Sequence, residues 1–262
     1  MRISKMDNQS TVSTLCLRLL AVIFLAVAVQ AQKTAEDHFT QGKKLVEDNC
    51  IDCMGGNRDG EEAGIRELEM AIQADEKPVE AYKLMAEAYA NLTTYAKSES
   101  DSQTFRNKEY DIYRKLYRLA PDDPQVLMEY AQTLTDIQEQ IPVYRKVVGL
   151  DPKNADARFM LGDSLLGQGK IKEGIEEMRL AVTLESNPEA VRNIVERLTE
   201  ALEKHNCPLQ DASTYNREVV RAEAAATQGA GNPQPMLVFK KKFAVALGRH
   251  SCTPVSANPG TR

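Results

Sequence analysis

The pattern in this sequence most typical of chemistry is a Cys-x-x-Cys pair, Cys50 and Cys53. Such a pair could act as a thiol–disulfide couple, or it could supply half of a zinc site. The surroundings fit neither role, because no thioredoxin-like strand and helix flank the motif and His38 is the only further soft ligand nearby. Met54 stands where haem attachment would require histidine. We therefore interpret the pair as a disulfide that closes a turn in an oxidising compartment, with a thiol–disulfide or assembly role as the alternative.

Two further cysteines, Cys207 and Cys252, lie near the C-terminal end of the chain. Together with Cys50 and Cys53 they give the mature chain an even number of four, which is typical of exported proteins with disulfides, because the fifth cysteine, Cys16, lies in the N-terminal residues 1–31 that are predicted below to be removed. A bond between Cys207 and Cys252 would tether the C-terminal segment to the helices that precede it. The sequence leaves the pairing of the four cysteines open.

The remaining reactive side chains form no recognisable catalytic or metal-binding pattern. His38, His205 and His250 are far apart along the chain, and no nucleophile has a base and an orienting carboxylate beside it. No phosphate-cradling glycine loop is present, and the acidic residues after the first cysteine pair lack EF-hand spacing. We interpret the paired carboxylates Glu61–Glu62 and Glu176–Glu177 as solvent-facing helix residues. The sequence therefore predicts no catalysis, no metal site and no cofactor.

The clearest structural pattern lies between Ala155 and Pro188. Apolar residues recur there at intervals of three and four, which indicates two amphipathic helices in succession. Gly169 lies between the two helices and allows the chain to reverse, because glycine can adopt a positive φ. The small residues Gly162 and Gly174 allow the two backbones to approach closely. This stretch is therefore predicted to form a helical hairpin.

The hairpin resembles a tetratricopeptide repeat, which is a helix–turn–helix unit of about 34 residues. The resemblance rests on that family's characteristic positions, which are occupied here by Leu161-Gly162, Gly174, Met178 and Ala181. The resemblance implies an all-α fold, a right-handed superhelical stack of helical hairpins with a C-terminal capping helix. About four repeats are expected, over residues 35–77, 78–123, 124–154 and 155–188. Capping helices over 189–228 and a linker and mostly irregular tail over 229–262 follow, and the apolar runs between Met236 and Leu247 could form a strand pair or a docked segment. The first two repeats carry insertions, and the third is short.

The N-terminal residues 1–31 have the pattern of a signal peptide. Basic residues precede an apolar run from Leu19 to Val29, which is too short to span a membrane, and Val29-Gln-Ala31 offers small residues for cleavage after Ala31. This pattern predicts export to the periplasm or the extracellular space, with an uncleaved membrane anchor as the alternative. The mature chain would contain no membrane span.

Removal of residues 1–31 would leave 30 basic and 37 acidic residues, a net charge of −7. Such a surface repels nucleic acid, so nucleic-acid binding is not expected. The predicted partner is instead a protein or peptide.

In tetratricopeptide stacks the first helix of each repeat lines a concave groove, and the resemblance transfers this role to particular positions. The groove residues expected in this way are Glu80, Lys83, Leu84 and Glu87 in the second repeat, Gln125, Met128, Glu129 and Gln132 in the third, and Asp156, Phe159, Met160 and Asp163 in the fourth. They are largely acidic and apolar, which favours a ligand segment with basic residues and an apolar anchor. The predicted function is a non-enzymatic adaptor or scaffold of the cell envelope, with self-association through open ends as a further mode. In layout the chain also resembles periplasmic repeat domains of cytochrome c biogenesis.

Overall fold

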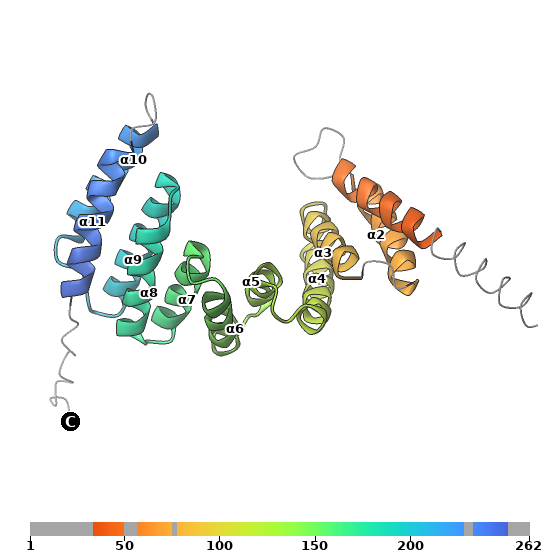
Figure 1. The fold of residues 1–262 in the computed structure, drawn as a ribbon, viewed down its shortest axis with the longest axis horizontal. Coiled ribbons are helices and arrows are strands. Elements are labelled where there is room, and N and C mark those ends of the chain that lie inside the picture. The colour runs from red at the N-terminus through yellow and green to blue at the C-terminus, as the bar shows by residue number, and fades with distance from the viewer. Residues whose placement is uncertain (1–33, 50–56, 75–77, 228–232, 251–262) are drawn as a thin grey trace, which may run out of the picture. The chain divides into compact units, whose positions relative to one another are not determined.

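The computed structural model describes residues 34–49, 57–74, 78–227 and 233–250 (Figure 1). Within these ranges all regular secondary structure is helical, which confirms the predicted all-α class. The chain divides into two compact units, Met1–Ala120 and Pro121–Arg262, and each is considered by itself below. In the described ranges, no helix has the length and apolar character needed to cross a membrane. The expected signal peptide lies outside the described residues.

The first unit consists of helical hairpins. Its elements are a helix over residues 34–48, α2 (Arg58–Gln73), α3 (Pro78–Thr94) and α4 (Glu99–Leu119). Side chains fix two of the helix starts: the Asn57 side chain accepts a hydrogen bond from the Gly60 amide, and Ser98 accepts one from the Asp101 amide. Helix α3 packs against both α2 and α4, so successive helices bury their apolar faces against one another.

Glycines allow the first two helices of this unit to pack closely. A Cβ atom on Gly42 would lie 2.7 Å from Cγ of Leu68, and one on Gly64 would lie 2.8 Å from Cγ2 of Val46. Real side chains do not approach this closely, so any larger residue at either position would push the helices apart. The pair thus sets the contact between the helix over residues 34–48 and α2.

A carboxyl group is buried between α2 and α3. The Glu61 side chain is fully buried, and its Oε1 accepts a hydrogen bond of 2.8 Å from the Asn91 side chain, whereas its Oε2 has no hydrogen-bond partner among the described residues. Burial, with a further contribution from the negative charge of Glu87, raises the pKa of Glu61 to about 7. The interpretation of Glu61 as a solvent-facing residue is therefore wrong. The residue lies on the face of α2 that packs against α3.

The second unit continues the pattern of antiparallel neighbours (Figure 1). Its helices are α5 (Pro124–Thr133), α6 (Ile137–Leu150), α7 (Ala155–Gly167), α8 (Ile171–Leu184), α9 (Pro188–Lys204), α10 (Ala212–Thr227) and α11 (Gln234–Arg249). Consecutive helices are in contact from α5 to α11, α7 also contacts α9, and α11 returns to pack against α8. A single apolar cluster runs from α7 and α8 through α9 and α10 to α11.

The hairpin of α7 and α8 has the features expected from the sequence. Gly169 adopts a φ of 78°, and the Lys170 amide donates a 2.9 Å hydrogen bond to the Leu165 carbonyl, which closes the end of α7. A Cβ atom on Gly162 would lie 2.9 Å from Cγ of Met178, and one on Gly174 would lie 2.6 Å from Cγ of Leu166. Both glycines are therefore needed for the close contact between the helices.

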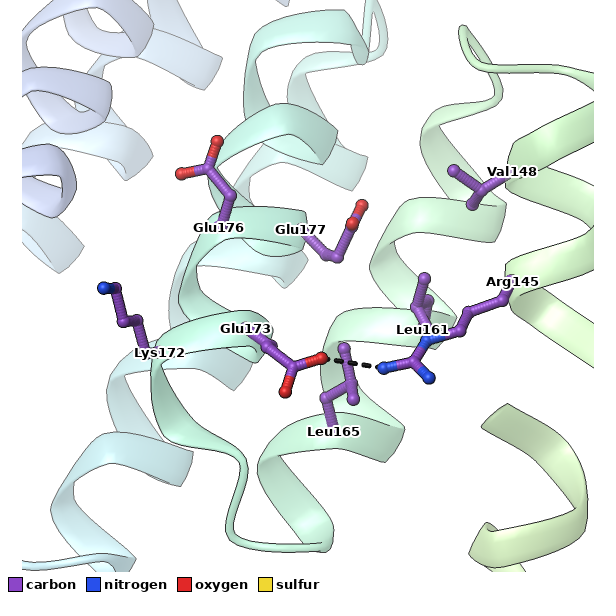
Figure 2. A pocket seen from close by; sticks show the side chains of 8 residues that line it. All are labelled: Arg145, Val148, Leu161, Leu165, Lys172, Glu173, Glu176 and Glu177. Carbon is purple, nitrogen blue, oxygen red and sulfur yellow. Dashed lines mark hydrogen bonds and ion pairs between the residues drawn. The ribbon is translucent and has the colours of Figure 1, made fainter. Parts of the chain in front are cut away.

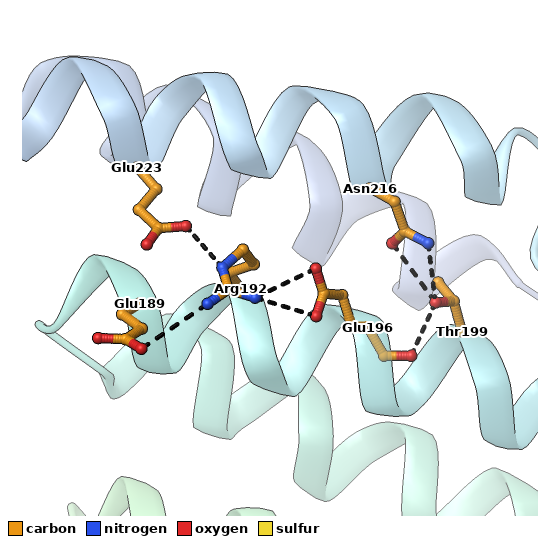
Figure 3. Close-up of polar contacts among 6 residues, drawn as sticks. All are labelled: Glu189, Arg192, Glu196, Thr199, Asn216 and Glu223. Carbon is orange, nitrogen blue, oxygen red and sulfur yellow. Dashed lines mark hydrogen bonds and ion pairs between the residues drawn. The ribbon is translucent and has the colours of Figure 1, made fainter.

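Polar contacts join α9 to α10 at the edge of the core. Nε of Arg192 donates a 2.7 Å hydrogen bond to Glu223, while its other nitrogens approach Glu189 and Glu196 of its own helix (Figure 3). Further along the same interface, Thr199 and Asn216 exchange hydrogen bonds between their side chains. These contacts fix the register of α10 on α9.

The C-terminal segment differs from the expectation of a linker followed by a mostly irregular tail. Its described part forms α11, whose Met236, Phe239, Phe243 and Leu247 are buried in the core. Phe243 stacks on Phe239 and meets the ring of Tyr215 edge to face. These four apolar residues recur at intervals of three and four, but three consecutive lysines interrupt the apolar runs and obscure the helical pattern in the sequence.

Candidate binding groove

A groove with a volume of about 640 Å³ lies between α5 and α7. Both helices begin at this groove. Their starts are fixed by Asp123 and Asn154, whose side chains accept hydrogen bonds from the first-turn amides of α5 and α7. The lining residues are Asp123, Pro124, Gln125, Met128, Glu129, Gln132, Asn154, Asp156 and Met160. The groove is therefore formed by the first helices of two consecutive hairpins.

The chemistry of the groove combines apolar and acidic side chains. Met128 and Met160 provide flexible apolar surface, and Glu129 and Asp156 provide negative charge. Within the described ranges, neither carboxylate belongs to an ion pair. A cationic group entering the groove would therefore gain an electrostatic partner without first displacing one.

The electrostatic environment beside the groove is negative. Burial raises the pKa of Glu129 above its ordinary value. Burial and the negative charges of Asp163 and Glu129 together raise the pKa of Tyr144, on α6, to about 12. A bound cation would favour the ionised form of Glu129 and offset the cost of its partial burial.

The structure brings together most of the groove residues expected in the third and fourth repeats. Gln125, Met128, Glu129, Gln132, Asp156 and Met160 all line the groove. The sequence reasoning missed Asp123, Pro124 and Asn154, although Asp and Asn before a helix are a recognisable capping pattern. These three residues form the end of the groove where the two helices begin.

Two expected groove residues in the fourth repeat have other contacts. Phe159 is partly buried against the apolar cluster around α8 and α9. Asp163 accepts two hydrogen bonds, of 2.7 and 3.1 Å, from Arg197 of α9, and it lines a separate hollow of about 110 Å³. The same side of α7 therefore faces the groove at its start and contacts α9 near its end.

The four residues expected in the second repeat lie on α3, in the first unit. Glu80 and Glu87 are exposed, and Lys83 and Leu84 are partly exposed. They form a partly acidic surface of α3.

A second hollow, of about 510 Å³, is formed by α6, α7 and α8 (Figure 2). Of its five charged residues, all except Lys172 are paired with other described residues of the protein. Arg145 donates a 2.7 Å hydrogen bond to Glu173, Glu177 binds Arg158, and Glu176 binds Arg179. Because a charged ligand would have to replace these contacts, the groove between α5 and α7 is the better candidate site.

Of the four cysteines that follow the predicted signal peptide, only Cys207 lies among the described residues, where it belongs to the apolar cluster. Cys50, Cys53 and Cys252 lie outside the described residues, and Cys207 is buried with its Sγ 3.2 Å from Nε2 of His250. Among the described residues, no group of three or more His, Cys, Asp or Glu side chains could hold a metal ion.

In the second unit, the paired helices and the groove between first helices define a stack of helical hairpins. Residues 155–188, the α7–α8 hairpin with its flanking residues, match the tetratricopeptide repeat family model. The chain therefore carries a tetratricopeptide repeat. No curated protein matches the sequence.

Solved structures of MamA have a similar fold. The structure of MamA from residue 41 to its end, from Desulfovibrio magneticus RS-1, superposes with a TM-score of 0.58 at 18% identity and covers 75% of this chain and 98% of that chain. A crystal structure of MamA gives a TM-score of 0.51 at 14% identity and covers 85% of this chain and 99% of that chain. At these identities the likeness concerns the fold, and it supports the all-α solenoid class.

Proposed function

We propose that this protein is a non-enzymatic protein-interaction scaffold whose groove between α5 and α7 binds a protein or peptide segment. The observation that carries this proposal is the groove itself, in which Met128 and Met160 lie beside the carboxylates of Glu129 and Asp156. Apolar and acidic side chains in one groove favour a segment with an apolar anchor and flanking basic residues. The tetratricopeptide repeat at residues 155–188 supports the same kind of function.

The proposal places the scaffold in the cell envelope. This part is supported by the signal-peptide pattern of residues 1–31, with its apolar run and small residues before Gln32. Mass spectrometry of the protein purified from its native cell should find Gln32 at the N-terminus. An N-terminus that still includes the apolar run would favour the membrane-anchored alternative.

The groove is tested by binding of synthetic peptides measured by isothermal titration calorimetry. One ten-residue peptide has a central leucine flanked by lysines, and its matched partner has glutamates in place of the lysines. We expect the lysine peptide to bind and the glutamate peptide to bind at least about tenfold more weakly, because like charges would face each other in the groove.

The double variant Glu129→Lys and Asp156→Lys should lose the preference for the lysine peptide while its circular dichroism stays unchanged. Glu203→Lys is the matched control, since this exposed residue of α9 carries the same charge outside the groove. Equal affinity of the double variant and the control for the lysine peptide would remove the groove from the proposal.

A further inference from the structure

The outer face of α11 is apolar although its inner face is already buried. Met236, Phe239, Phe243 and Leu247 point into the core, whereas Leu237, Val238 and Val245 are 42%, 63% and 52% exposed. A helix with apolar residues on both faces is typically covered on both faces. The terminal helix of a solenoid, in contrast, usually presents a polar outer face. The exposed residues therefore indicate a surface that contacts a partner.

The charge of this helix distinguishes it from the rest of the protein. Helix α11 contains Lys240, Lys241, Lys242 and Arg249 and no acidic residue, whereas the whole chain has a net charge of −5. Lys240 and Lys242 contact their own unit, because Lys240 donates to the Glu185 carbonyl and Lys242 pairs with Glu218.

The other two basic residues of α11 are exposed, and helical spacing places them on the same face as Val238 and Val245. We call this face, formed by Leu237, Val238, Lys241, Val245 and Arg249, the α11 ridge. It combines apolar side chains with positive charge and carries no negative charge. Its partner should therefore offer apolar surface together with carboxylates.

The groove between α5 and α7 has the complementary composition. It offers the apolar side chains of Met128 and Met160, and the carboxylates of Glu129 and Asp156 lie beside them. The ridge cannot reach the groove of its own chain, because the inner face of α11 is held against α8 and α10 and the groove lies at the other end of the same unit (Figure 1). A second copy of the chain has no such restriction.

We infer that the α11 ridge of one copy docks in the α5–α7 groove of a second copy. This inference rests on the proposed function, since it names a partner for the same groove. The contact is heterologous, because each copy uses its ridge on one neighbour and its groove on another, and such contacts produce open chains or rings. The ridge is a single helix face, so we expect weak association that increases with protein concentration and decreases with added salt.

Sedimentation velocity of the full chain over a range of concentrations tests this inference. The wild-type protein should form species larger than a dimer. Val238→Glu places a negative charge in the apolar part of the ridge, and the double variant Glu129→Lys and Asp156→Lys reverses the charge of the groove. Each variant alone should remain monomeric. Leu150→Glu is the matched control, because Leu150 is 44% exposed on α6 and lies outside both surfaces, and it should associate like the wild type.

Mixing the ridge variant with the groove variant gives the decisive result. The mixture retains one intact groove and one intact ridge, so it should form a one-to-one complex and nothing larger. A wild-type protein that stays monomeric at every concentration would overturn the inference. So would a groove variant that still associates by itself, since the ridges would then pair with each other. Binding of the wild type to phosphatidylglycerol vesicles without self-association would reassign the ridge to a lipid surface.

The ridge variant also separates this inference from the proposed function, because Val238→Glu leaves the groove intact. If this variant binds the lysine peptide but the mixture forms no complex, only self-association is wrong. If it fails to bind the peptide, the proposed function of the groove fails.

Discussion

Replacing the buried Glu61 by glutamine should change how the stability of the first unit depends on pH. The Glu61 carboxyl has an ordinary pKa of 4.5 in the unfolded chain and a pKa of about 7 in the folded protein. Below pH 4.5 the group is protonated in both states, and its burial carries no charge. Between pH 4.5 and about 7 the unfolded chain releases a proton that the folded protein keeps, so stability falls as the pH rises.

The magnitude follows from the difference between the two pKa values. Each pKa unit corresponds to about 1.4 kcal/mol, so the folded protein should lose about 3 kcal/mol of unfolding free energy between acidic pH and pH 8 through this group. The glutamine side chain cannot ionise, and its amide oxygen can still accept the hydrogen bond from Asn91. Glu61→Gln should therefore gain up to about 3 kcal/mol over wild type between pH 4.5 and pH 8.

Urea unfolding followed by circular dichroism at pH 4.5, 6 and 8 measures this difference. Comparing the variant with wild type at several pH values cancels any pH-independent cost of the amide. Glu69→Gln, an exposed position on the same helix, is the matched control and should follow the wild-type profile. Parallel pH profiles for Glu61→Gln and wild type, or a Glu61 carboxyl that titrates near 4.5 by carbon-13 NMR, would refute this reasoning.

Two further predictions concern the second unit. Gly162→Leu should lower the melting temperature and reduce the free energy of unfolding by about 1–3 kcal/mol, because even a Cβ atom would meet Met178 at 2.9 Å. Gly149→Ala is the control and should have little effect, since nothing lies within 4 Å of its Cβ position. Equal melting temperatures of the two variants would contradict the packing argument. Among the pairings that the sequence leaves open, we predict the bond between Cys207 and Cys252, which would tether the C-terminal segment to the helices before it. Peptide mapping without reduction should then recover these two cysteines linked, and a free thiol at Cys207 in the exported protein would contradict that pairing.

The helical fold was predictable because its cause is local. Apolar spacing of three and four residues and the turn at Gly169 indicate the α7–α8 hairpin from sequence alone. Helix α11 was not predicted, although Met236, Phe239, Phe243 and Leu247 have the same spacing. Three lysines between the apolar runs hid this pattern.

The groove was predictable only in part, for a different reason. Repeat positions identify which residues lie on the first helix of each repeat, so Met128 and Asp156 were expected to line the groove, where the structure places them. The partners of Asp163 and Glu61 depend on residues of the next helix, Arg197 and Asn91, which are distant in sequence. Spacing within one helix carries no information about such contacts.

The glycine pairs of two hairpins have a consequence for the evolution and engineering of this protein. Gly42 and Gly64 are 22 residues apart in the sequence and Gly162 and Gly174 are 12 apart, yet a Cβ at any of the four would meet a side chain of the opposite helix within 3 Å. Helix crossing is thus set by surface contact, and the length of the connecting segment is free to vary. Loop closure costs only about 0.6 kcal/mol per doubling of length. A foreign peptide inserted at Gln168 should therefore be displayed at the turn without repacking the hairpin.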